Sequence, residues 1–106
     1  MKVTTTDGVI LRMTELDALD PVTVLLKDDG PGKGGINIEC WGECWCAYWC
    51  AMGCKDVVAF FCEADSTYLL GKLAQHKATA HQIRYLKRII EAVQGGLALW
   101  EDRATP

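Results

Sequence analysis

Three segments in the first 41 residues are apolar at alternate positions or rich in β-branched residues, a pattern that predicts β-strands. They span residues 9–16, 22–27 and 36–41. Asp20-Pro21 marks a turn between the first two segments, and the glycine-rich stretch 28–35 forms the loop before the third. Because these connections are short, the pattern predicts a three-stranded antiparallel meander.

Beyond residue 42 the apolar residues recur every three or four positions, which is the spacing of amphipathic helices. A first helix over residues 43–52 would carry four large side chains on one face: Trp45, Tyr48, Trp49 and Met52. Three further helices would span residues 57–63, 67–75 and 79–94. Each follows a good capping residue, in order Asp56, Ser66 and Thr79, and the last of these opens the capping box Thr79-Ala80-His81-Gln82. Gly95-Gly96 is expected to end the last helix.

These elements predict an α+β fold in a single domain, residues 1–106. The three-stranded antiparallel sheet occupies the N-terminal half (1–41), and three to four helices from the C-terminal half (42–96) cover one of its faces. Residues 97–106 would form a packed segment around Leu97 and Trp100, followed by a polar tail.

The charge balance narrows the classes of partner. The chain has 14 acidic and 11 basic residues, a net charge of −3, which argues against a general nucleic-acid or membrane-surface binder. No segment approaches the ~18 consecutive apolar residues that span a bilayer. The N-terminus lacks the apolar core of a secretory signal. We therefore expect a cytoplasmic protein without a membrane partner.

All six cysteines fall between residues 40 and 62. When residues 43–54 are laid on a helix, Cys46, Cys50 and Cys54 form a stripe at intervals of four, and together with Cys62 they could supply thiolate ligands to zinc. The chain has no Cys-x-x-Cys pair, however, and reduced cysteine is common as a small core residue. We predict no cofactor, with a zinc-binding interaction module as the alternative. No set of acid, base and nucleophile can be assigned, so we predict a non-enzymatic protein.

Basic residues form a stripe along the last predicted helix and the residues just before it. Lys77, Arg84, Lys87 and Arg88 recur at helical spacing. Such a stripe can contact nucleic-acid phosphates, but it is more often the solvated face of an amphipathic helix. Nucleic-acid binding is therefore the third hypothesis.

Tryptophans and acidic residues supply the candidates for a protein-binding surface. Four tryptophans are many for a core of this size, and an exposed one would be a typical binding hot spot. The carboxylates could imitate the charge of nucleic acid against a basic protein surface. The candidate set is Trp41, Glu39, Glu43, Asp56, Glu63 and Asp65.

Between residues 42 and 73 the chain carries a series of aromatic and small residues: Gly42, Trp45, Tyr48-Trp49, Met52-Gly53, Phe60-Phe61-Cys62, Tyr68-Leu69 and Lys72-Leu73. This series resembles a family of small accessory proteins encoded by tailed phages and prophages. The chain departs from the family pattern at Cys44, Cys46 and Cys50, which counts against a shared cysteine site. The resemblance implies an accessory protein in the cytoplasm of a host bacterium. Such a protein would bind a host protein or defence complex and inhibit it, in the manner of an anti-CRISPR.

Overall fold

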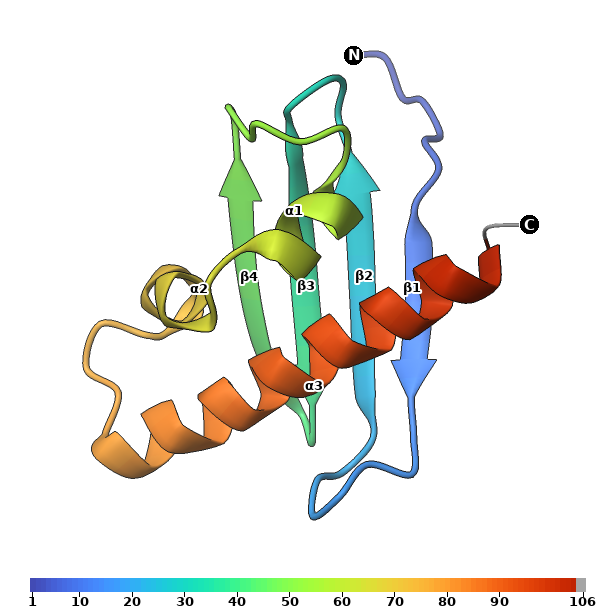
Figure 1. The fold of residues 1–106 in the computed structure, drawn as a ribbon. Coiled ribbons are helices and arrows are strands. Elements are labelled where there is room, and N and C mark those ends of the chain that lie inside the picture. The colour runs from blue at the N-terminus through green and yellow to red at the C-terminus, as the bar shows by residue number, and fades with distance from the viewer. Residues whose placement is uncertain (105–106) are drawn as a thin grey trace.

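The computed structural model describes residues 1–104, which form a four-stranded antiparallel sheet with three helices on one of its faces (Figure 1). The strands lie in the order of the sequence: β1 (Val9–Met13), β2 (Val22–Asp28), β3 (Gly34–Cys40) and β4 (Glu43–Trp49). The helices are α1 (Val57–Glu63), α2 (Ser66–Leu73) and α3 (Ala80–Ala104). The α+β class with an antiparallel sheet is as predicted, but the sheet has one strand more than the three expected.

The predicted helix over residues 43–52 is wrong, because this segment contains β4, which pairs with β3 along its whole length. Trp45 and Trp49 are four residues apart, a spacing that places two side chains on one face of a helix or of a strand. Both are buried in β4, while Cys46 lies on the opposite, exposed face of the strand. The cysteine stripe expected on a helix therefore does not form.

The prediction that α3 ends at Gly95-Gly96 is also wrong, because the helix continues through both glycines for a total of 25 residues. Val93 and Leu97 are four residues apart and fully buried, so the apolar stripe crosses the glycines without interruption. Their burial offsets a helix-propensity cost of about 1 kcal/mol per glycine. The segment expected after the helix thus belongs to it, except for residues 105 and 106 of the expected tail, which lie outside the described residues. No helix within residues 1–104 is long and apolar enough to cross a membrane.

The helices begin at or close to the capping residues that the sequence predicts. The Asp56 carboxylate accepts a hydrogen bond of 2.8 Å from the backbone N–H three residues further on. Thr79 and Gln82 exchange the two reciprocal bonds of the predicted capping box, at 3.1 and 2.8 Å. At α2 the N-cap is Asp65, one residue before the predicted Ser66.

The core lies between the helices and the inward face of the sheet, and α3 crosses the sheet diagonally from β4 to β1 (Figure 1). Fully buried side chains come from both layers, among them Val24, Ile38, Phe61, Leu69 and Ile90. No helix within residues 1–104 covers the opposite face of the sheet, which is mostly exposed. The hairpin between β3 and β4 projects from one end of these two layers, close to the first half of α3 (Figure 1).

Candidate functional site

The β3–β4 hairpin has a two-residue loop, Trp41-Gly42, between the paired residues Cys40 and Glu43. Both loop residues have positive φ, 54° at Trp41 and 80° at Gly42, as in a type I′ turn. This turn is normally built from Asn-Gly or similar pairs, because a bulky side chain is strained at positive φ. The left-handed conformation costs a residue such as tryptophan about 1–2 kcal/mol.

Trp41 is also the tryptophan most exposed to solvent. Its exposed fraction is 79%, whereas Trp45 and Trp49 are 7% exposed and Trp100 is half-buried. Trp41 therefore combines a strained backbone with an indole that gains little from burial inside the chain. Large aromatic side chains in such positions are frequent hot spots of protein interfaces.

A cavity of about 250 Å³ opens beside this hairpin. It is bounded by the hairpin loop, the start of β4, the α2–α3 connection and the first turns of α3. Its aromatic lining consists of Trp41, Trp45 and Tyr85, and its polar lining includes Glu43, Gln75, His81 and Gln82. Pockets for drug-sized ligands usually measure ~300–1,000 Å³, so this one suits a single side chain or a small molecule.

Two of the aromatic rings that line this cavity are in contact with each other. Trp45 and Tyr85 pack edge to face, with ring centroids 6.4 Å apart and an interplanar angle of 63°. The Tyr85 hydroxyl lies 3.3 Å from Cys40 Sγ. This hydrogen bond, burial and the nearby charges of Asp20 and Glu43 raise the pKa of Tyr85 to about 12. The phenol therefore stays neutral, and two carboxylates, Asp20 and Glu43, lie close enough to act on it.

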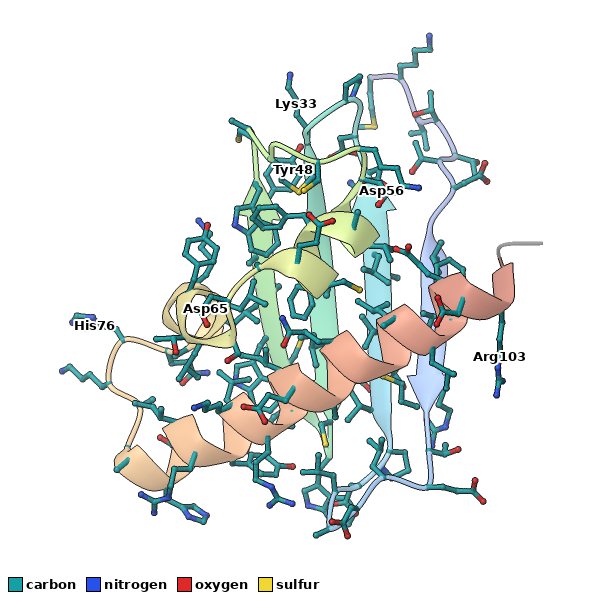
Figure 2. The ribbon with its side chains drawn as sticks, viewed as in Figure 1. Lys33, Tyr48, Asp56, Asp65, His76 and Arg103 are labelled. Carbon is teal, nitrogen blue, oxygen red and sulfur yellow. The ribbon has the colours of Figure 1, made fainter. Side chains whose placement is uncertain are left out.

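The six residues predicted to bind a partner do not form one surface. Trp41 and Glu43 line the cavity. Asp56 and Asp65 cap α1 and α2, and Figure 2 shows Asp56 at the start of α1, with Asp65 apart from it beside α2.

The remaining two acidic residues also lie apart. Glu63 accepts a bond of 3.4 Å from the Cys54 thiol, and Glu39 lies on the outer face of β3, exposed to solvent. The N–H of Val57, which follows the Asp56 cap, bonds Asp28 at the end of β2. Asp28 lies at the end of the sheet opposite the hairpin. Asp56 is therefore about seven strand residues, or ~20 Å, from Trp41. The five acidic residues and Trp41 are therefore not brought together in one surface.

The predicted basic stripe is exposed, but one of its members has a structural role. Lys77 lies in the α2–α3 connection, and Arg84, Lys87 and Arg88 are exposed on α3. Arg88 donates hydrogen bonds to two carbonyls of the β1–β2 loop, at 3.2 and 3.3 Å. This pattern suits a solvated helix face that also braces a neighbouring loop.

The four predicted zinc ligands lie in different environments. Cys46 is on the outer face of the sheet and Cys50 follows the end of β4, whereas Cys54 precedes α1 and Cys62 lies within it. Burial and the nearby carboxylates, Glu63 and Asp56 among them, raise the pKa of both the Cys54 and the Cys62 thiols. Across residues 1–104, no group of three histidine, cysteine or acidic side chains is arranged to hold a metal. The geometry thus gives the zinc alternative no support.

Two other surfaces are less suited to a binding site. A cavity of about 580 Å³ lies between β1 and the second half of α3, lined mainly by Leu11, Met13, Leu99 and Trp100. It is larger and somewhat more open than the hairpin cavity, and its polar lining includes two arginines, Arg12 and Arg103. On the outer face of the sheet several polar groups bond one another, for example Cys44 to Asn37 at 2.6 Å and Tyr48 to Asp29 at 2.9 Å. Such a face is typical of an antiparallel sheet in contact with water.

The sequence did not single out Tyr85 or Trp45 as site residues, although both form walls of the hairpin cavity. Trp45 was expected on a helix, so its position beside α3 could not be anticipated. His81 and Tyr85 are four residues apart, which places them on one face of α3. That spacing was the available signal for a shared site.

A family model described as a phage family, Phage_phiTE_072, matches residues 1–90. This range includes the whole sheet, α1, α2 and every residue that lines the hairpin cavity, whereas much of the lining of the larger cavity comes from residues 92–103. No curated protein and no solved structure shows a significant match to the chain.

Proposed function

Because this chain belongs to the phage protein family Phage_phiTE_072, we propose that it acts by binding a protein of the bacterial host. The contact would be made in the host cytoplasm by the Trp41 hairpin and the cavity beside it. Binding would inhibit a host complex, in the manner of an anti-CRISPR.

The proposal rests on two properties of Trp41, its strained backbone and its exposed indole. Its positive φ is unfavourable by about 1–2 kcal/mol, and its indole remains 79% exposed. Asparagine or glycine would form the same turn without the strain. Burial of the indole in an interface would contribute a favourable free energy that offsets the cost of the positive φ. The isolated chain provides no such contribution.

The surroundings of Trp41 support the same surface. The type I′ turn is short and anchored by two paired strands, so it holds the indole in a defined direction. Preorganisation of this kind reduces the entropy lost on binding. The adjacent cavity offers a concave surface into which a side chain of the partner can insert.

Site-specific photo-crosslinking tests the proposal. Benzoylphenylalanine replaces Trp41 in one variant and Leu99 in a control variant, and each chain is irradiated inside bacterial cells. Leu99 is 54% exposed, and it lies on the second half of α3, away from the hairpin. We expect a discrete adduct with one host protein from position 41 and none with that protein from position 99.

The adduct must also correspond to a functional complex. The purified host protein should bind the unmodified chain reversibly, and its activity should fall when the chain is added. Identical adduct patterns from positions 41 and 99, or a captured protein that does not bind the unmodified chain, would refute the proposal.

A further inference from the structure

We infer that the hairpin cavity binds a guanidinium group, the side chain of an arginine on the partner protein. This inference rests on the proposed function for the origin of the arginine, but the cavity's preference for this cation is a property of the isolated chain.

The walls of the cavity are those expected for a flat organic cation. Trp41, Trp45 and Tyr85 contribute three aromatic rings, two of which meet at an interplanar angle of 63°. Aromatic faces carry negative charge density and attract cations, tryptophan most strongly. A group inserted between such walls can lie over one ring while its edge meets another.

The charged groups in the lining of the cavity also favour a cationic ligand. Glu43 is in the lining, and none of the lining residues is lysine or arginine. Asp20 acts on Tyr85 together with Glu43, so a second carboxylate lies near the aromatic wall. His81 is the one histidine in the lining.

Arginine fits these walls better than lysine. Its guanidinium is planar, stacks on aromatic faces and is more weakly hydrated than an ammonium group. Its five N–H donors can bond the Glu43 carboxylate and, at the same time, the amide oxygen of Gln75 in the lining. The volume of about 250 Å³ accommodates one such side chain and little more.

A titration with small model compounds tests this inference without the partner. N-acetylarginine amide is added to the isotopically labelled protein in mildly alkaline buffer. Binding is followed by the NMR signals of the indole N–H groups and of Tyr85. We expect saturable shifts at Trp41 and Trp45, with a dissociation constant on the order of a few millimolar.

Two comparison compounds separate charge from shape. N-acetylcitrulline amide has nearly the same shape but no charge, and it should give no saturable shifts. N-acetyllysine amide should bind at least about 3-fold more weakly than the arginine compound. Equal binding of the citrulline compound, tighter binding of the lysine compound, or no saturable shift with the arginine compound would overturn the inference.

Two matched variants locate the binding. Glu43→Gln keeps the shape of the cavity and removes its charge, so it should weaken binding of the arginine compound about 5- to 10-fold. Glu91→Gln makes the same change in total charge on an exposed part of α3 outside the cavity, and it should leave the affinity unchanged. Equal effects of the two variants would also overturn the inference.

The two proposals can fail separately. If position 41 cross-links a host protein but the arginine compound does not bind, the guanidinium site is refuted and the binding function stands. If the compound binds as described but position 41 gives no specific adduct, the cavity is a cation site and the proposed function is refuted.

Discussion

Replacing Trp41 by asparagine should leave the protein folded and about as stable as the unmodified chain, or slightly more stable. Asparagine is the residue that most readily accepts the positive φ of 54° found at this position. The substitution removes the whole indole from the tip of the hairpin. It therefore separates the contribution of this side chain to binding from any contribution to folding.

The structure gives the size of the two opposing effects. Relief of the left-handed strain should gain about 1–2 kcal/mol. About a fifth of Trp41 is removed from water, since 79% of it is exposed. A tryptophan buries roughly 150–250 Å² when fully enclosed. About 30–50 Å² of contact would thus be lost, which is worth about 1 kcal/mol. The net change in the free energy of unfolding should lie between about 0 and +1 kcal/mol.

Denaturant unfolding followed by circular dichroism measures this change, with Trp41→Ala as the matched control. Alanine also removes the indole, but its Cβ keeps the strain at positive φ, so it should be less stable than the asparagine variant by roughly 1 kcal/mol. A loss of more than 2 kcal/mol in Trp41→Asn would show that the indole supports the fold, and the argument from strain and exposure would fail.

Three further predictions concern the fold and its ionisable groups. In the native protein at about pH 7, the exposed thiols Cys44, Cys46 and Cys50 should react rapidly with a disulfide reagent. Cys54 and Cys62 should react more slowly, because their raised pKa values reduce the thiolate fraction, and buried Cys40 should react only on unfolding; fast labelling of Cys40 would contradict the packing. Gly95→Ala should stabilise the protein by about 0.5–1 kcal/mol, since a Cβ there meets no atom within 4 Å. Gly96→Ala should gain less, because its Cβ would lie 2.5 Å from Met13 Sδ, and an equal gain in thermal unfolding would argue against this contact. The pKa of Tyr85 is raised from 10.0 to about 12, so its contribution to stability is present below about pH 10 and is lost as the pH rises towards 12. Tyr85→Phe should lose less stability across that interval in alkaline unfolding, and an unchanged pH dependence would refute the assignment.

The sequence was sufficient where one local signal determines the structure. The alternation of buried Ile36, Ile38 and Cys40 with exposed polar residues corresponds directly to the two faces of β3. The side chains of Asp56 and Thr79 cap the helices that follow them, as their positions predicted. In these places the local preference and the tertiary packing favour the same conformation.

The sequence was insufficient where the helical and the strand periodicity fit the same residues. Trp45 and Trp49 share a face both in a helix and in a strand, so their spacing cannot decide between them. The deciding feature is the turn at Trp41-Gly42, which has a glycine but lacks the asparagine that usually signals such a hairpin. Because the segment of β4 was predicted to be a helix, Cys46, Cys50 and Cys54 were expected to form a stripe. This stripe does not form in the strand.

The candidate site could be anticipated only in part. Trp41 and Glu43 were singled out from composition, and both line the hairpin cavity, whereas Asp56 and Asp65 serve as helix caps. Tyr85 joins the site because α3 crosses the sheet beside β4, at Trp45. Contacts between residues forty positions apart depend on how the layers pack, and no local pattern encodes them.

The most direct test of the central claim is the affinity of the host protein that cross-links at position 41. Isothermal titration compares the unmodified chain, Trp41→Asn and the control Leu99→Ala. A hot-spot tryptophan is worth about 2 kcal/mol or more, so Trp41→Asn should weaken binding at least about 30-fold. Leu99→Ala should change it less than about 2-fold. Binding of a folded Trp41→Asn variant with unchanged affinity would contradict the assignment of the hairpin as the binding surface.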